Sequence, residues 1–312
     1  MLRSVFRLDD AVRAGMTPDQ LRGRMYERIG RSVYRRRDTV IRPVDVYAAF
    51  SRSSPDTYLS HTSAALAWGI WLPPRIQPGF PIHLSRTGPD RTVPRQKNVI
   101  GHWSSAAPAD VREIDGFRIA SPALAWTQLA GSALGLEDLV VAGDALLQDP
   151  DGPPRAENVV GTNPLATTEE LERLLQRRAG FRGRRLAMEA LPLLRARADS
   201  RPESIVRQRL IRQGFPESEA NPVLGFVEGR RIRPDLADRV HRIAVQYEGK
   251  QHNEEAQLGR DILRDADLER IGWISVRTDK AFFTPRGEQA FFDRLRAAYD
   301  KRGVIIGRVR RA

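Results

Sequence analysis

A stretch rich in proline, glycine and asparagine, over residues 151–166, interrupts the sequence near its middle. Such a composition favours turns and irregular backbone, so no helix or strand is expected across it. The chain has 312 residues, which is more than one hydrophobic core usually holds. We therefore expect two folded domains joined by this linker, the second of them over residues 167–312.

The chain is strongly basic, with 51 lysine and arginine residues against 39 acidic ones and a net charge of +12. Only four of the basic residues are lysine, and the planar arginine fork suits phosphate groups. The arginines are clustered: residues 22–42 hold eight against two acids, and residues 173–212 hold twelve against three. Clustering favours a nucleic-acid partner over a simple compositional bias. DNA is the expected polyanion, and RNA stays open as an alternative.

The sequence contains no cysteine, which excludes disulfides, thiolate metal sites and a cysteine nucleophile. Any metal ion must therefore be held by carboxylates or histidines. The longest apolar run, over residues 64–72, is too short to span a bilayer, so no membrane partner is expected. Charged residues at positions 3, 7, 9 and 10 interrupt the first ten residues, so we expect no signal peptide and a cytoplasmic protein.

Residues 1–45 carry the pattern of a winged helix-turn-helix. A short helix is expected over residues 8–14, and Thr17 with Gln20 predicts a capping box that opens a second helix. Leu21, Met25 and Ile29 would form the buried stripe of that helix, and a basic hairpin over residues 31–40 follows. The pattern also fits a small helical hairpin with a solvated face. If the segment binds DNA, the expected phosphate contacts come from Arg22, Arg24, Arg28, Arg35, Arg36 and Arg37.

Residues 46–150 are expected to fold as a mixed α/β region, with helices over residues 60–68, 122–129 and 136–147 and a strand over residues 81–84. No motif in this region has an assignable chemistry. The histidines His61, His83, His102 and His241 are scattered through the chain without the spacing of a metal site, so they receive no role.

The last third of the chain alternates in the order helix, three strands, helix, strand, helix, and acidic groups stand where two of the strands end. Asp235 ends one expected strand, and Glu248, with Lys250 two residues later, ends the next. Neighbouring strands would bring Asp235 and Glu248 together as ligands of Mg²⁺ or Mn²⁺, with Lys250 steadying the scissile phosphate. Glu203, on the preceding helix, would orient a metal-bound water. Taken alone, Glu203 is more simply the partner of Ser200 in a capping box.

These residues in combination resemble the PD-(D/E)XK nuclease superfamily and, within it, the very-short-patch-repair-like branch. The matching positions are Glu203, Pro234-Asp235, Gln246 to Gly249 with His252, Arg260-Asp261, and Gly272-Trp273 with Arg277. The resemblance covers residues 200–280 and implies a restriction-endonuclease-like α/β domain with a mixed central sheet. It also implies metal-dependent endonuclease activity, with Asp235, Glu248, Lys250 and Glu203 as catalytic residues supported by Gln246 and His252. Residues 1–45 are similar to the winged helix of AbiEi-type antitoxins.

Gln246 departs from the family pattern, in which an acid stands two residues before an Asp-Gly pair, and Glu248 replaces that aspartate. A neutral amide is a weaker ligand for magnesium than a carboxylate. Either Glu248 and Lys250 supply the acid and the lysine in a shifted register, or metal binding is weakened. The second case predicts a non-catalytic, antitoxin-like transcriptional regulator built on a nuclease fold, with a toxin partner or a homodimer left open.

Overall fold

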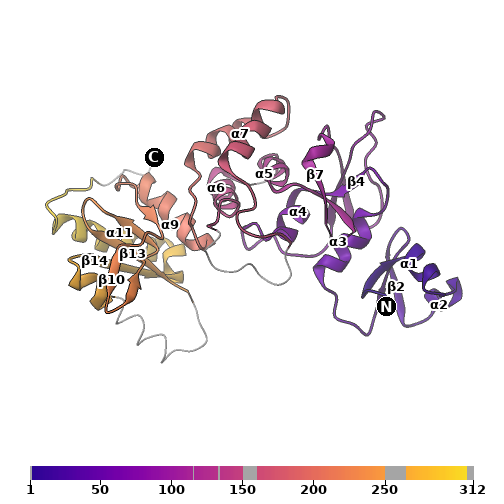
Figure 1. Cartoon of the computed structure of the whole chain (residues 1–312), viewed down its shortest axis with the longest axis horizontal. Coiled ribbons are helices and arrows are strands. Elements are labelled where there is room, and N and C mark those ends of the chain that lie inside the picture. The colour runs from indigo at the N-terminus through magenta and orange to yellow at the C-terminus, as the bar shows by residue number, and fades with distance from the viewer. Residues whose placement is uncertain (1, 115, 133, 150–159, 250–264, 308–312) are drawn as a thin grey trace. The chain divides into compact units, whose positions relative to one another are not determined.

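The computed structural model describes residues 2–114, 116–132, 134–149, 160–249 and 265–307 (Figure 1). The chain divides into two compact units, Met1–Leu194 (unit 1) and Arg195–Ala312 (unit 2), and both mix helices with strands. A mixed α/β chain was expected from the sequence, and the structure confirms it. No helix in the described part of the chain is both long enough and apolar enough to cross a membrane.

Unit 1 begins with a small three-stranded sheet and two short helices. The elements are β1 (Val5–Arg7), α1 (Leu8–Arg13), α2 (Pro18–Arg22), β2 (Tyr26–Gly30) and β3 (Val33–Arg36), and the antiparallel sheet has the order β1-β3-β2. Thr17 and Gln20 form the expected capping box at the start of α2. The expectation that this helix reaches Ile29 is wrong, because Gly23 caps it after Arg22 and residues 26–30 pair as a strand.

The remainder of unit 1 is a five-stranded sheet covered by helices. Its strands are β4 (Thr57–Leu59), β5 (Ile82–Arg86), β6 (Val99–Trp103), β7 (Val111–Ile114) and β8 (Phe117–Ala120), in the order β6-β5-β4-β8-β7. The helices are α3 (Pro43–Ser51), α4 (His61–Ala67), α5 (Pro122–Ala130), α6 (Leu136–Asp144), α7 (Thr168–Arg177) and α8 (Arg184–Ala190), with short 3₁₀ turns at Pro108–Asp110 and Leu191–Leu193. The helices expected near residues 60, 122 and 136 and the strand near residue 82 are confirmed.

Two buried tryptophans anchor this core. The Trp68 indole donates to the carbonyl oxygen of Ala120 at 2.7 Å, and the Trp126 indole donates to that of Leu139 at 2.9 Å. Both rings are buried. Each indole N–H, the one polar group of the side chain, is therefore hydrogen-bonded to the backbone while the ring fills the core.

Helices α7 and α8 belong to unit 1, although the sequence assigned residues 167–194 to the C-terminal domain. The strongly amphipathic α7 buries Leu171, Leu174 and Leu175 in the same hydrophobic cluster as Trp68 and Trp126. Helix α7 is therefore part of the hydrophobic core of unit 1, and separating it would expose these leucines to water. The compact C-terminal unit accordingly begins at Arg195 and not at residue 167.

Unit 2 keeps the expected order of a helix, a group of strands, a helix, a strand and a helix, but five strands stand where the sequence predicted three. Its elements are α9 (Arg201–Arg212), β9 (Glu219–Ala220), β10 (Gly225–Val227), β11 (Arg230–Ile232), β12 (Leu236–Asp238), β13 (Ile243–Glu248), a helical stretch over residues 265–270, β14 (Ile274–Asp279), the 3₁₀ turn Lys280–Phe283 and α11 (Pro285–Asp300). The four-stranded sheet has the order β14-β13-β12-β9, and β10 and β11 form a separate hairpin. Strands β12 and β13 are antiparallel, whereas β13 and β14 are parallel.

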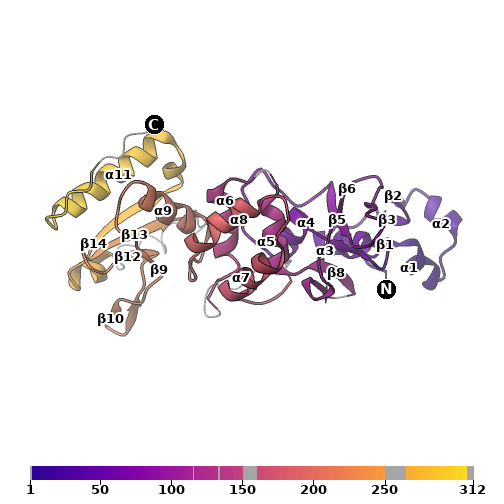
Figure 2. The same cartoon turned by 90° about the horizontal axis from the view of Figure 1, so that it is seen from above.

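Helices cover the four-stranded sheet of unit 2. Leu268 of the helical stretch over residues 265–270 clusters with Ala237 and Ala244 on one face. Helices α9 and α11 lie together on one side of the strands (Figure 2), where Arg209 of α9 forms an ion pair with Glu288 of α11 at 3.0 Å. Because strand residues alternate between faces, Gln246 and Glu248 lie on the same face as Ala244.

Candidate functional site

A buried carboxylate stands in the first turn of α9. Glu203 is only 8% exposed and accepts hydrogen bonds from the Ser200 hydroxyl at 2.7 Å, the Asp199 amide at 2.9 Å and the Asn221 side chain at 2.7 Å. Ser200 is the N-cap of the helix, as expected, but Glu203 binds the Asp199 amide and not the Ser200 amide that would complete a capping box. The cap residue therefore also fixes the carboxylate of Glu203 in one orientation.

Asp235 lies beside Glu203 and immediately before β12. Its Oδ2 atom accepts a hydrogen bond from the Tyr247 amide at 2.6 Å, and its carbonyl oxygen accepts one from the Asn221 amide at 2.8 Å. Asn221 thus binds both acidic residues, one through its side chain and one through its backbone. Burial and the nearby charge of Asp235 raise the pKa of Glu203 to about 7. Two carboxylates held this close favour a shared proton or a bound cation.

The strand next to Asp235 presents an amide, Gln246, and no acid at the position opposite Asp235. Leu236 pairs with Val245, so the antiparallel register places Asp235 opposite Gln246. The buried Gln246 donates its amide to Asp265 Oδ1 at 3.1 Å and to the Ser275 hydroxyl at 2.9 Å. Gln246 is therefore anchored to the neighbouring helical stretch and to β14.

Glu248, two residues further along β13, is held by an arginine. Arg277 Nη1 contacts Glu248 Oε1 at 2.5 Å, and Arg277 Nε contacts Asp265 Oδ2 at 2.7 Å. Within the described ranges, Glu203, Asp235 and Glu248 do not form a group of three whose ligand oxygens all lie within 4.8 Å of one another. The structure thus brings Glu203 to Asp235 and gives Glu248 an ion pair. Of the other expected residues, Lys250 and His252 lie outside the described residues.

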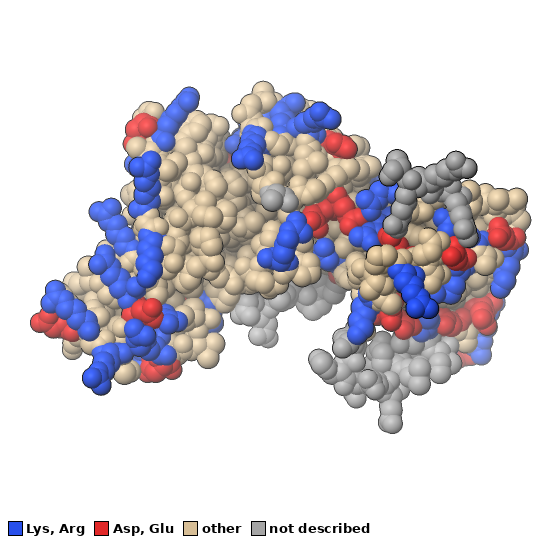
Figure 3. Space-filling model, turned by 180° about the vertical axis from the view of Figure 1, so that it is seen from behind, with Lys and Arg blue, Asp and Glu red and all other residues tan. Residues whose placement is uncertain are grey.

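Four of the six arginines expected to bind phosphate form ion pairs with acids in the folded chain. Arg35 and Arg37 both contact Glu27, at 2.5 and 3.5 Å, and these contacts hold the pKa of Glu27 below its usual range. Two further pairs follow the same pattern: Arg36 with Asp38 and Arg22 with Asp19, each at 2.7 Å. Figure 3 shows this mixture, with red side chains set among the blue ones at the lower left. Arg24 and Arg28 have no ion pair among the described residues.

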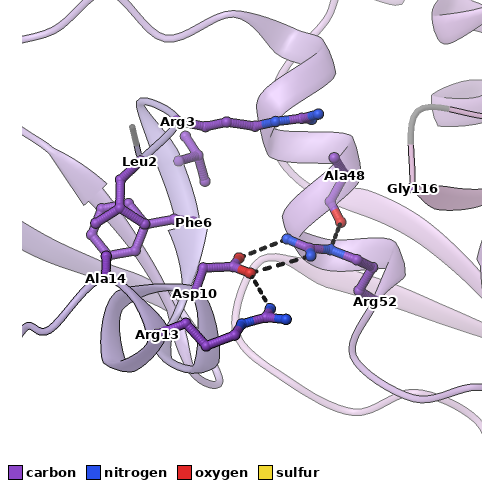
Figure 4. A pocket seen from close by; sticks show the side chains of 10 residues that line it. Leu2, Arg3, Phe6, Asp10, Arg13, Ala14, Ala48, Arg52 and Gly116 are labelled. Atoms are coloured by element: carbon purple, nitrogen blue, oxygen red, sulfur yellow. Dashed lines mark hydrogen bonds and ion pairs between the residues drawn. The ribbon is translucent and has the colours of Figure 1, made fainter.

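A cavity of about 480 Å³ lies between the small N-terminal sheet and α3 (Figure 4). Asp10 points into it and is bound by Arg52 and by Arg13, each at 2.7 Å, while Arg52 also donates to the carbonyl oxygen of Ala48 at 3.3 Å. These groups satisfy one another and tie α1 to α3. We therefore assign this cavity a structural role within unit 1.

Three histidines that the sequence left without a role meet in unit 1. His61 is the first residue of α4, His83 lies on β5 and His102 lies on β6. One ligand nitrogen from each ring lies within 4.8 Å of the other two, and His83 Nδ1 is 3.0 Å from His102 Nε2. Burial lowers the pKa of all three, that of His61 to about 2 and that of His102 to about 4.

No local spacing could have revealed this histidine trio, because long-range pairing creates it. Strands β5 and β6 are parallel, and His83 pairs with Ile100. His102 lies two residues beyond Ile100 and so shares the face of His83.

The chain was compared with protein-family models, with curated proteins and with solved structures, and none of the three comparisons gave a match.

Proposed function

We propose that unit 2 hydrolyses phosphodiester bonds in DNA, with a divalent metal ion held at Glu203 and Asp235. The observation that carries the proposal is the buried Glu203 carboxylate beside Asp235, with its pKa raised to about 7. A buried carboxylate with a raised pKa beside a second, half-buried carboxylate is characteristic of sites that bind a cation or move a proton. Hard oxygen ligands suit Mg²⁺ or Mn²⁺.

The order of elements around the pair supports the same proposal. A helix carries Glu203, the antiparallel strands β12 and β13 follow Asp235, and a helical connection leads to the parallel strand β14. This is the arrangement that the resemblance to the PD-(D/E)XK superfamily implies. Ser200 and Asn221 orient Glu203, and the Tyr247 amide orients Asp235.

The chemistry that Mg²⁺ supplies in such sites is activation of a water and stabilisation of charge on the phosphate. The residues of this chain bind and orient: Glu203 and Asp235 offer oxygens of fixed direction, and a proton on Glu203 must leave before both carboxylates are charged. Lys250, outside the described residues, is the proposed partner of the scissile phosphate.

DNA binding by unit 1 belongs to the same proposal, with residues 1–45 acting as a winged-helix-like segment. The two short helices α1 and α2 and the hairpin β2–β3 support it. Arg24 and Arg28 are its best phosphate ligands, because neither forms an ion pair with an acid in the described part of the chain.

Two features of β13 favour a second candidate, a non-catalytic DNA-binding regulator. Gln246 occupies the position opposite Asp235, and Arg277 neutralises Glu248, so the strand β13 offers no free carboxylate within its described length. A nuclease fold with these two features would bind nucleic acid or a partner protein without cleaving it.

Asp235→Asn should separate the two candidates, since it keeps the shape of the side chain and removes the charge that a metal ion needs. We expect Mg²⁺ or Mn²⁺ to support cleavage of duplex, mismatched or single-stranded DNA by the wild type, and EDTA to abolish it. The variant should lose about two orders of magnitude or more in rate and keep its DNA affinity. Asp300→Asn, on the exposed end of α11, is the matched control and should cleave like the wild type.

Gln246→Glu provides the converse comparison because it restores an acid opposite Asp235. Faster cleavage by this variant would mean that the amide attenuates the natural site. A wild type that binds DNA but cleaves none of the substrates with either metal would refute the enzyme and leave the regulator. RNA should be included as a substrate, since cleavage of RNA alone would reassign the polyanion.

A further inference from the structure

The three clustered histidines belong to unit 1, and the function proposed above does not use them. We propose that His61, His83 and His102 bind a divalent transition-metal ion, with zinc as the best-fitting ion. The three rings come from three different elements, and one nitrogen from each lies within 4.8 Å of the other two.

The spacing of the nitrogens fits a metal ion at their centre. Zinc binds histidine nitrogens at about 2.0–2.1 Å in tetrahedral geometry, which sets neighbouring ligand nitrogens about 3.3–3.4 Å apart. His83 Nδ1 and His102 Nε2 are already 3.0 Å apart. The third nitrogen, on His61, lies within 4.8 Å of both, and the rings would have to rotate to bring all three to ligand distance from one ion.

The backbone places the three histidines next to one another. His83 and His102 are fixed by the parallel pairing of β5 with β6. His61 has a left-handed φ of +50°, which a residue with a side chain rarely adopts, and its amide donates to Gln128 Oε1 at 2.9 Å. Its ring stacks on that of His102 with centroids 3.7 Å apart. A strained residue kept at a cluster of ligating groups is typical of functional sites.

The donor set selects the class of ion. Three imidazoles without a carboxylate favour zinc, copper, nickel or cobalt over magnesium and calcium, which prefer oxygen ligands. Imidazole binds these ions through the lone pair of a neutral ring nitrogen.

The surroundings leave room for a fourth ligand. The trio lines a pocket of about 340 Å³ together with Ser85, Arg178 and Arg182. Three protein ligands with an open position are the pattern of zinc sites that bind water or substrate. Because Arg178 places positive charge near His61, an anion such as hydroxide or phosphate is the fourth ligand that balances the charge of the site.

Zinc binding by the full-length chain, freed of any histidine tag and stripped with a chelator, tests the proposal. Titration against a chromogenic zinc chelator should show one tight site per chain, and Mg²⁺ should not compete for it. Cobalt should give the intense visible absorption of a tetrahedral site. His83→Gln and His102→Gln should each weaken zinc binding at least about tenfold, because even the loss of an outer partner costs that much.

His241→Gln is the matched control, because His241 lies in unit 2, where it binds Asp238. This variant should bind zinc like the wild type. Folding of every variant is checked by circular dichroism without metal, and zinc should raise the Tm of the wild type and of His241→Gln only. No zinc site in the wild type, or equal binding by His83→Gln and His102→Gln, would overturn the proposal and leave a hydrogen-bonded histidine pair beside a stacked ring.

Discussion

Single residues decide the electrostatics of the carboxylate pair, and Glu203 is the most perturbed of them. Its pKa is raised from 4.5 to about 7 by burial and by the charge of Asp235. Between about pH 4.5 and pH 7, Glu203 is therefore protonated in the folded chain and ionised in the unfolded chain. The contribution of this group to the free energy of unfolding is present below that window and is lost as pH rises through it.

Glu203→Gln should remove this pH dependence. A glutamine can keep the same three contacts and never ionises, so between about pH 5 and pH 8 the variant should gain on the order of 1–3 kcal/mol relative to the wild type. Urea unfolding of both proteins in EDTA at the two pH values measures the difference. Parallel pH profiles for the two proteins would show that Glu203 is already ionised at pH 5.

Glu203 and Asp235 could be predicted from the sequence, whereas the histidine trio could not. The two acids belong to short local signals, a helix cap and a Pro-Asp pair. The expectation that Asp235 ends a strand is wrong, because it immediately precedes β12. The histidines become neighbours only through the register of β5 and β6 and the start of α4. The ion pair between Glu248 and Arg277 likewise depends on the parallel pairing of β13 with β14.

At the scale of elements, the short α2 and the hairpin β2–β3 change which arginines can contact DNA. Arg24, Arg28 and Arg31 have no acidic partner within the described ranges, whereas Arg35, Arg36 and Arg37 contact Glu27 or Asp38. A guanidinium bound to a carboxylate has fewer N–H donors left for a phosphate, and the negative charge of that carboxylate weakens the attraction.

Two triple alanine variants with equal loss of charge should therefore behave differently. Each phosphate contact adds about 0.9 to the slope of log affinity against log salt. Replacing Arg24, Arg28 and Arg31 should lower the slope more than replacing Arg35, Arg36 and Arg37, and both changes should weaken binding to all sequences alike. Fluorescence anisotropy over a salt series measures both slopes. The reverse ranking would place the DNA contact on β3.

The end of α2 could not be predicted from the spacing of apolar residues. Leu21, Met25 and Ile29 have helical spacing, yet Met25 is 49% exposed and Ile29 is buried from a strand. Gly23 ends the helix, and Tyr26 and Ile29 then favour strand pairing with β3. The spacing of the apolar residues did not indicate that Gly23 would end the helix before Met25 and Ile29.

At the scale of the whole molecule, the division after Leu194 predicts which fragments fold. A fragment of residues 195–312 should unfold cooperatively, because its core lies within unit 2. A fragment of residues 167–312 should bind more of a hydrophobic dye, since it carries Leu171, Leu174 and Leu175 without the cluster that buries them. Thermal unfolding and dye binding compare the two. An unfolded shorter fragment beside a folded longer one would restore the boundary at residue 167.

Because each unit is one continuous stretch of chain, the polypeptide passes between them once, at Leu194–Arg195. A break at this position cuts none of the described helices or strands. Genetic recombination at the corresponding codons could therefore join either unit to another gene without destroying a fold. The two metal-binding arrangements proposed here would be inherited separately.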